Sequence, residues 1–589
     1  MLVASAVAVI ALAYGAWLAH QVLAVRDHLK AARGNLEILE AQLATGHVSP
    51  DTTTLQRLQS DANEARAVTS TPGWKFAVAV PQIGPNFQTA SELSVSVDDI
   101  VDRAIVPLLS DADLLDFEAL APSNGAVNLE QLQRGAPKLI AAANVVQLSY
   151  ERLSRIESSV LVSQISEPLA EATEELGDLS RRLDVAASAA KLAPAMLGSN
   201  EQRRYLLLVQ NNAELRATGG IPGALAVLTL NNGTMTLEDQ TTASALGQFV
   251  PPIPTDAEQN QLYTARLGRY MQDVNLTPHF PTAAQTAQAM WEKNTGEKLS
   301  GVLSIDPITL GYLIDASGPI SLTNPDLIAS LPKEFPKELT GDNVVPTLLS
   351  EVYTKIREPQ LQDAYFAGVA EATFRKLLSG SAQPNLLLQK IAKATDEGRI
   401  RLWSTTASEQ SLIASYPLGG SVAGPNVQPS EFGVYFNDGT GAKMDYYVQR
   451  TVQLRKKCPA DGYEQVTVRV TSTNTAPLDA ATSLPSYVTG AGDFGVPPGS
   501  VQTNIVVYGP VQALVETAQL DGQKTEFAPH RHDARPVGVL AVRLAPGESK
   551  TAEFTFSKIV QHTEPNLVVT PTVQPVKDVT LPIENASCP

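Results

Sequence analysis

The chain has 589 residues, of which 43% are hydrophobic and 18% charged, so it can bury a large core and wholesale disorder is excluded. Asp and Glu number 61 against 44 Lys and Arg, and the resulting formal charge of -17 disfavours a nucleic-acid partner. Only two cysteines are present, which excludes an iron–sulfur protein and a disulfide-dense scaffold.

The N-terminal segment, residues 1–25, carries no formally charged side chain and is almost entirely apolar. About 20 helical residues cross a bilayer core of roughly 30 Å, so we predict a transmembrane anchor and a single-pass protein of the cell membrane. A cleaved signal peptide is the alternative, but no basic residue precedes the apolar stretch. The charges of Arg26, Lys30 and Arg33 favour a cytoplasmic body, in conflict with the cysteines discussed below.

Residues 26–197 show helical periodicity and are predicted to form a helical stalk or bundle without chemistry of its own. Two successive segments place apolar and small side chains on one face, at spacings of three and four residues. These side chains are Leu29, Ala32, Leu36, Leu39 and Leu43, followed by Leu55, Leu58, Ala62 and Ala65. A further helical stretch is expected over 126–190.

Strands alternate with helices over 198–395, which indicates an α/β layered core. The apolar run Tyr205–Val209 has the length of a strand, and Asn231-Asn232-Gly233 is a hairpin turn signal. Further on, Asp306 is a predicted N-cap that precedes Pro307 in the first turn of a helix. A later helix, over 343–378, is expected to break at Pro359.

The last region, 396–589, consists of short apolar runs between Gly, Pro and Asn clusters, which is typical of an antiparallel β-sandwich. Cys458 and Cys588 both lie there, and a disulfide between them would stabilise the region by about 2–4 kcal/mol. Such a bond implies an oxidising compartment and hence an extracytoplasmic body. Two unpaired buried cysteines are the alternative.

The four regions together predict an α+β multidomain fold class. It consists of a transmembrane helix, a helical stalk, an α/β core and a C-terminal β-sandwich.

The densest polar cluster spans 210–220 and directly follows the apolar strand. In open α/β sheets ligands bind at the carboxyl ends of strands, so we expect a site there. The guanidinium of Arg216 is a planar fork suited to phosphate or carboxylate. The candidate residues are Asn211, Asn212, Glu214, Arg216 and Thr218. A loop whose polar groups only satisfy turn geometry is the alternative.

Two further polar groups extend the candidate site. The first contains Arg266, Arg269, Asp273, Asn275 and His279 in a predicted loop, and the second contains Arg357, Gln362 and Asp363 near the expected helix break. Surface ion pairs in solvated loops are the alternative for both groups.

The block LLLVQNNAELRATGGIPGALAVLTLNNGTM resembles a family of membrane-anchored actinobacterial proteins that is defined as a domain of unknown function. The blocks VLSIDPITLGYLIDASGPISL and GDNVVPTLLSEVYTKIREPQLQDAYF extend this resemblance over nearly the whole chain. Membership in that family implies no activity.

The chain is also distantly similar to the LytR–CpsA–Psr (LCP) glycopolymer transferases, through Glu214, Arg216 and Thr218 after the apolar strand and through 313–320. That resemblance implies an extracytoplasmic enzyme that moves a polymer from a polyprenyl pyrophosphate carrier to the cell wall. The sequence departs from the family pattern at Ala217-Thr218-Gly219, where a magnesium-binding acid is missing, and at Pro319.

Three functions are open at this point. In an LCP-like transferase, Arg216, Arg269 and Arg357 would hold the pyrophosphate, and Glu214 or Asp273 would bind Mg²⁺ or act as base. In a cell-wall glycoside hydrolase, Glu214 and Asp273 would be the acid and the base. In a non-catalytic envelope scaffold, the pocket would only bind glycan and the β region would recruit envelope protein partners.

Overall fold

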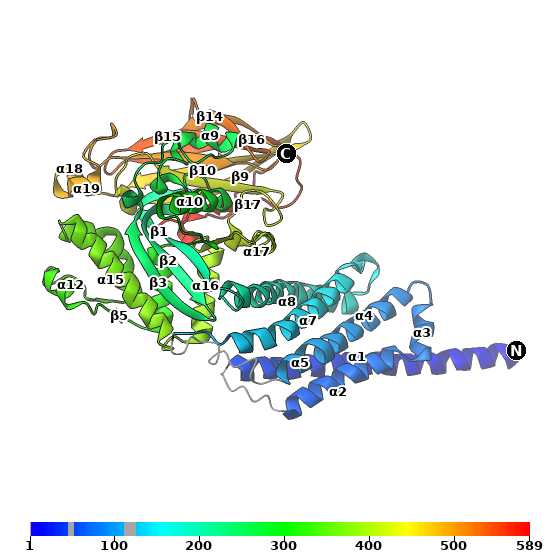
Figure 1. The fold of residues 1–589 in the computed structure, drawn as a ribbon. Helices are drawn as coiled ribbons and strands as arrows, with labels where there is room; N and C mark the ends of the chain where they lie inside the picture. Colours follow the sequence, from blue (N-terminus) through cyan, green and yellow to red (C-terminus); the bar gives the residue numbers. More distant parts are fainter. Residues whose placement is uncertain (1, 45–51, 111–124, 589) are drawn as a thin grey trace. The chain divides into compact units, whose positions relative to one another are not determined.

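The computed structural model describes residues 2–44, 52–110 and 125–588 (Figure 1). The chain divides into two compact units. The helical unit comprises 1–121 and 127–199, and the sheet-containing unit comprises 122–126 and 200–589.

Every regular element in the described part of the helical unit is a helix. The long helices are α1 (Leu2–Ala44), α2 (Thr52–Thr69), α4 (Gly84–Ile100), α7 (Leu129–Ser154) and α8 (Ser163–Met196). The short elements are α3 (Pro72–Val78), the π-helical turn Val101–Ile105, α5 (Val106–Leu109) and the 3-10 turn Ser158–Val160. The predicted apolar faces are confirmed, because Ala32 and Leu39 of α1 are buried in one cluster with Leu58 and Ala62 of α2. Each large apolar side chain buried this way stabilises the fold by roughly 1.5–3 kcal/mol.

The N-terminal segment is the main correction to the sequence analysis. In the part of the chain that the structure describes, no helix is long and apolar enough to cross a membrane, so the predicted transmembrane helix over 1–25 is not found. Helix α1 continues without a break to Ala44; its Leu18, Val25 and Leu29 side chains pack in one cluster of the helical unit, whereas Leu12 and Leu23 are exposed. Tyr14 donates a hydrogen bond of 2.8 Å to the Gly73 carbonyl, and Val25 is buried against Trp74. Composition alone does not separate a membrane span from the apolar part of a longer helix such as α1, which packs on Trp74 through Val25.

The sheet-containing unit begins with a five-stranded mixed sheet in the order β3-β2-β1-β4-β7. Its strands are β1 (Arg203–Arg216), β2 (Gly219–Asn231), β3 (Thr234–Thr242), β4 (Gly301–Ile305) and β7 (Arg401–Ser404). Strand β1 pairs antiparallel with β2 and parallel with β4. The remaining elements of this part are α9 (Ala257–Tyr263), α10 (Phe280–Thr295), α11 (Pro307–Ser317), β5 (Ile320–Ser321), α12 (Pro325–Ser330), β6 (Glu338–Leu339), α13 (Gly341–Pro346), α14 (Val352–Lys355), α15 (Pro359–Leu378), α16 (Pro384–Asp396) and α17 (Ala407–Ile413).

Several predictions from short local motifs are confirmed in this part. The β2–β3 hairpin turns at Asn232 and Gly233, both with positive φ, as the two central residues of such a turn require. The Asp306 carboxylate caps α11 by accepting from the backbone N–H of Thr309 at 2.8 Å. The helix expected over 343–378 is interrupted before Pro359, where α15 begins.

Two further five-stranded sheets follow, in the orders β13-β12-β16-β10-β9 and β14-β15-β11-β8-β17. Their strands are β8 (Glu431–Asp438), β9 (Val448–Ala460), β10 (Tyr463–Asn474), β11 (Val501–Tyr508), β12 (Leu514–Leu520), β13 (Gln523–Thr525), β14 (Ala528–His532), β15 (Arg535–Leu544), β16 (Ser549–Ile559) and β17 (Asn566–Val569), with short helices α18 (Ala480–Ser483), α19 (Ser486–Thr489) and α20 (Val576–Val579). One apolar cluster joins the two sheets, and in it the rings of Phe432 on β8 and Phe556 on β16 lie 5.5 Å apart.

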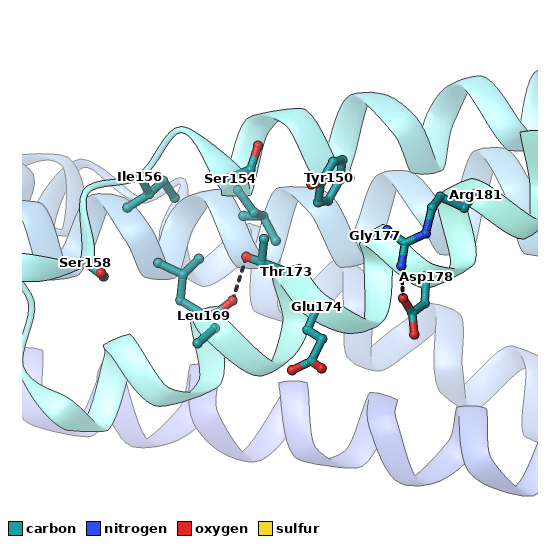
Figure 2. Close-up of a pocket in the computed structure, with 12 residues that line it drawn as sticks. Tyr150, Ser154, Ile156, Ser158, Leu169, Thr173, Glu174, Gly177, Asp178 and Arg181 are labelled. Atoms are coloured by element: carbon teal, nitrogen blue, oxygen red, sulfur yellow. Dashed lines mark hydrogen bonds and ion pairs between the residues drawn. The ribbon is translucent and has the colours of Figure 1, made fainter. Parts of the chain in front are cut away.

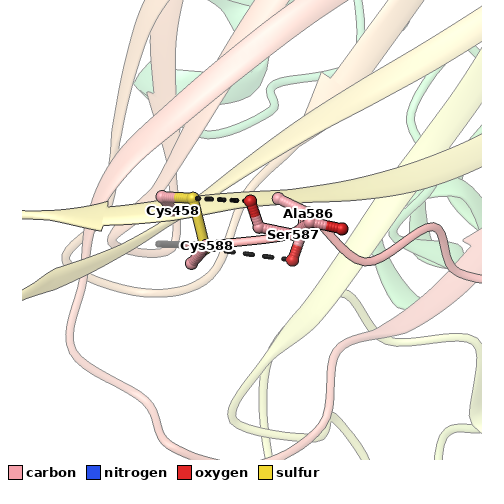
Figure 3. The surroundings of a disulfide bond; sticks show 4 residues. All are labelled: Cys458, Ala586, Ser587 and Cys588. Carbon is pink, nitrogen blue, oxygen red and sulfur yellow. Dashed lines mark hydrogen bonds between the residues drawn. A yellow bond between two sulfur atoms is a disulfide. The ribbon is translucent and has the colours of Figure 1, made fainter.

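The C-terminal tail covers the free edge of β9. The backbone of Glu584 donates to the Leu454 carbonyl at 2.9 Å and accepts from Lys456 at 2.8 Å, which continues the sheet by a short parallel pairing. A disulfide joins Cys458 to Cys588, 130 residues apart, and so ties the tail to this edge (Figure 3). A covered edge cannot pair with the strands of another chain.

Candidate functional site

The polar cluster over 210–220 lies mainly inside a strand rather than in a loop after one. Strand β1 continues to Arg216, and its pairing with β2 extends to Arg216 opposite Gly219, with an irregularity between Asn211 and Leu215. Gly220 is required at this irregularity, because a Cβ atom there would lie 2.2 Å from the carbonyl of Asn211. The candidate side chains are therefore fixed by a sheet.

A chain of ion pairs runs through the predicted catalytic residues. The Nη2 atom of Arg216 lies 3.2 Å from Asp273 Oδ1 and 3.5 Å from Glu214 Oε1. At the two ends, Asp273 Oδ2 lies 3.0 Å from Arg266 Nε, and Glu214 Oε2 lies 3.3 Å from Lys443 Nζ. Every oxygen of the two carboxylates thus has a cationic partner. We call these five residues the ion chain.

The ion chain is largely buried. The side chains of Arg216 and Asp273 are 6% and 4% exposed, and only Arg266, at 58%, reaches solvent freely. The ammonium of Lys443 lies between two aromatic rings, 5.1 Å from the Tyr353 centroid and 4.9 Å from that of Tyr487. Burial opposes the charges of Arg216 and Lys443, but the neighbouring carboxylates outweigh it and raise the pKa of both groups.

Three more buried charges surround the ion chain and connect β1 to the later sheets. Asp445 accepts from the backbone N–H of Leu215 at 2.9 Å and pairs with Arg450, both side chains being fully buried. The carboxylate of Asp438 accepts from two backbone N–H groups of its own turn. Burial, together with the charges of Asp445 and Glu214, raises the pKa of Asp438 to about 7.

The predicted amide and hydroxyl residues are also held by internal hydrogen bonds. Asn275 donates to Thr218 Oγ1 at 2.9 Å and to the Gly220 carbonyl at 2.8 Å. Asn212, fully buried, donates to Asp306, and Asn211 donates to the hydroxyl of Tyr353. Three buried polar atoms here, Asn212 Oδ1, Asn275 Oδ1 and Arg216 Nε, have no hydrogen-bond partner among the described residues, so the network is satisfied only in part.

Three of the predicted charged residues, Arg269, Arg357 and Asp363, lie outside the ion chain. Arg357 is exposed between α14 and α15, and Asp363 is exposed on α15, where partial burial raises its pKa. Within the described residues, neither shares an ion pair or hydrogen bond with the cluster. The half-buried Arg269 contributes its backbone carbonyl to Phe249, and its Nε atom has no partner in the described part of the chain.

The two predicted magnesium ligands do not fit that role. Glu214 and Asp273 are bridged by the guanidinium of Arg216, which supplies the positive charge that a metal ion would otherwise bring. A divalent cation would have to displace this guanidinium and meet its repulsion. Over the ranges that the structure describes, no group of three or more His, Cys, Asp or Glu side chains is arranged to hold a metal ion.

Sequence reasoning missed the partners of the ion chain. Lys443, Asp445 and Asp438 lie more than 200 residues after β1 and carry no motif, so no local signal identifies them.

Two hollows lie away from the ion chain. One, of about 470 Å³, lies between α7 and α8. Figure 2 shows Tyr150 of α7 facing α8, with Arg181 and Asp178 paired with one another at the same end. The other, of about 350 Å³, belongs to the sheet-containing unit and is lined by Asp239, Gln240, Thr241, Ala245, Leu246, Trp291, Asn294, Thr295 and Glu297. None of the predicted site residues lines either hollow.

Comparison with known proteins gives a family match over part of the chain. Residues 200–353, which include β1 to β5 and Asp273, match a family described as a protein of unknown function, DUF4012. No curated protein matches the chain. A crystal structure from Legionella pneumophila, described as "a putative nutrient binding protein", aligns over 22% of this chain and 42% of its own, at 6% identity and a TM-score of 0.14. That alignment carries no argument about fold or function.

The family match corrects the finer assignment made from the sequence. It supports a domain of unknown function over residues 200–353 alone, and nothing in the comparisons supports the QNNAELR signature, the LCP similarity or a transferase. The matched residues contain the central part of the ion chain, Glu214, Arg216, Arg266 and Asp273, but not Lys443.

Proposed function

We propose that this chain is a non-catalytic binding or scaffold protein of the cell envelope, and that its sheet-containing unit contacts cell-wall glycan or envelope proteins. The observation that carries the proposal is the ion chain, in which all four oxygens of Glu214 and Asp273 are paired with cations. A carboxyl group that exchanges protons with a substrate needs a free oxygen within hydrogen-bond reach of it.

The same observation argues against a pair of hydrolytic carboxylates. Glu214 and Asp273 approach the same Nη2 atom of Arg216, so this guanidinium bridges the two carboxylates. A glycoside hydrolase needs one protonated acid and one ionised partner, with room for the sugar between them. In the ion chain the Arg216 guanidinium lies within 3.5 Å of both carboxylates, where the sugar would have to bind.

The disulfide supports the proposed location. Cys458 is half-buried and Cys588 is exposed. A disulfide that solvent can reach in this way persists where the surroundings are oxidising. An extracytoplasmic position next to the cell wall meets that condition.

The proposal is tested with the full chain and two preparations: insoluble peptidoglycan, and a synthetic saccharide linked to polyprenyl pyrophosphate with Mg²⁺. We expect the protein to sediment with peptidoglycan, to release no reducing ends from it and to transfer no saccharide. Turnover of either preparation that disappears in a folded Glu214→Gln variant would overturn the proposal.

A further inference from the structure

The hollow of about 350 Å³ beside β3 is a built feature of the sheet-containing unit. Its lining comes from three places: residues 239–241 of β3, the turn that contains Ala245 and Leu246, and the end of α10 with the residues after it. Its volume falls within the range of small-molecule sites in proteins. All of its lining residues lie inside the segment 200–353 that matches the protein family.

A bulge in β3 presents the polar side of the hollow. In the pairing of β2 with β3, Leu225 lies opposite Thr241 and Val227 opposite Glu238, so Asp239 and Gln240 together face the single residue Ala226. Asp239 has a φ of +49°, a conformation that costs free energy for any residue except glycine and is more common for Asp and Asn than for most others. Bulges of this kind redirect side chains and are frequent next to binding sites.

Arg204 holds the acidic side chains of the hollow in place. Its Nη2 atom lies 3.1 Å from Asp239 Oδ2 and 3.1 Å from Glu297 Oε2. The two charged residues that line the hollow are thus both acidic, and one guanidinium neutralises only one of the two charges. This arrangement favours a neutral or positively charged ligand and disfavours a phosphate.

The other lining groups can both donate and accept hydrogen bonds. The side-chain amides of Gln240 and Asn294 are exposed and make no hydrogen bond with any described residue. Trp291 of α10 backs the hollow, 3% exposed, and its indole N–H has no acceptor in the described part of the chain. Carboxylates accept hydrogen bonds, and amides and hydroxyls both donate and accept them. Such a set of groups is complementary to the adjacent hydroxyl groups of a sugar ring.

We propose that this hollow binds a saccharide ring that is neutral or carries an amino group. The inference rests on the proposed binding role and gives it a site, formed by Asp239, Gln240, Asn294 and Glu297. The ion chain takes no part in it.

The test is isothermal titration of the full chain with D-glucosamine, N-acetyl-D-glucosamine and D-glucose 6-phosphate. We expect saturable binding of at least one of the first two sugars, and glucose 6-phosphate weaker by about tenfold or more, since an uncompensated charge next to carboxylates opposes binding. Ala245→Trp fills the hollow from an exposed position and is expected to abolish binding without changing the midpoint of thermal unfolding.

A matched pair of variants tests the site even if the Ala245→Trp variant does not fold. Gln240→Ala removes one amide from the hollow and is expected to weaken binding by roughly tenfold, whereas Gln360→Ala removes an exposed amide from α15 and is expected to change nothing. The inference is overturned if neither sugar binds at concentrations that saturate a millimolar site. The inference is also overturned if glucose 6-phosphate binds more tightly than the other two sugars. It is likewise overturned if a folded Ala245→Trp variant binds the sugars as tightly as the wild type. None of these results bears on turnover, so the proposed function stands or fails separately.

Discussion

One exposed set of ion pairs in the helical unit contrasts with the buried ion pairs of the sheet-containing unit. In the helical unit, Arg33 of α1 reaches Glu171 and Glu175 of α8 at 3.0 Å each, with all three side chains at least half exposed. In the sheet-containing unit, Arg450 pairs with Asp445 with both side chains fully buried, and the ion chain lies beside them. The geometry is similar, but only the buried charges have lost their water, so only they leave a costly charge behind when a partner is removed.

The largest expected effect follows from breaking the ion chain at its centre. Arg216→Met leaves Glu214 and Asp273 without their shared cation, and removal of one partner of a buried pair costs about 3–5 kcal/mol of unfolding free energy. Hydrogen exchange of the β1 and β2 amides, which reports this unit separately, is expected to speed up accordingly. Unchanged exchange would mean that water reaches the cluster.

The disulfide is the next strongest constraint. Cys588→Ser releases the tail from β9 and is expected to lower the free energy of unfolding by about 2–4 kcal/mol, because the unfolded chain loses a closed loop. Denaturant titration of the wild type in the presence of a reductant is expected to give the same free energy of unfolding as the variant. Ser587→Ala, one residue earlier, is the control and is expected to be unaffected. A variant as stable as the wild type would show that the tail contributes nothing.

A pH effect is expected from Asp438. Its pKa is raised by burial to about 7, so the folded state holds its proton more tightly than the unfolded state, where an Asp titrates near 4. The protonated carboxyl group therefore makes its full contribution to the free energy of unfolding below about pH 4, and this contribution is lost as the pH rises through 7.

Comparison with a variant isolates this contribution. Asp438→Asn is expected to remove the decline in unfolding free energy between about pH 4 and 7, measured by denaturant titration at several pH values. His279 acts in the opposite direction, because burial lowers its pKa to about 4 and its stabilising effect is lost as the pH falls from 6.5. A wild type and an Asp438→Asn variant with parallel pH profiles would contradict the assignment.

The smallest effect is expected in the helical unit. Arg33→Met removes the contacts to Glu171 and Glu175, but these exposed charges regain water, so no resolvable change in the unfolding midpoint is expected. Thermal unfolding at low and high salt checks this result, since screening weakens what little attraction exists. A loss comparable with that of Arg216→Met would remove the distinction between exposed and buried ion pairs.

Local signals explain which parts of the fold could be predicted. The turn at Asn232-Gly233 and the cap at Asp306 depend on residues within three or four positions of each other, and both are confirmed. The sequence predicts a strand only over Tyr205–Val209, because Gln210 to Arg216 are mostly polar and lack the alternation that marks a strand, whereas β1 continues to Arg216. Their burial depends on Lys443 and Asp445, more than 200 residues away.

Tertiary contacts decide the site residues as well. Arg216 and Glu214 come from one polar cluster of the sequence and Asp273 from another, and their pairing depends on contacts that spacing does not reveal. The hollow beside β3 was not anticipated, because Asp239 and Asn294 lie 55 positions apart and carry no shared motif.

On this account the charges of the ion chain compensate one another inside the fold and do not react. The most direct test compares Arg216→Met, Asp273→Leu and the double variant by denaturant unfolding. In the double variant Glu214 keeps its pairing with Lys443, and the exposed Arg266 is solvated by water. The double variant is therefore expected to recover most of the stability that either single change removes. Single changes that leave stability intact but abolish a turnover would contradict the account.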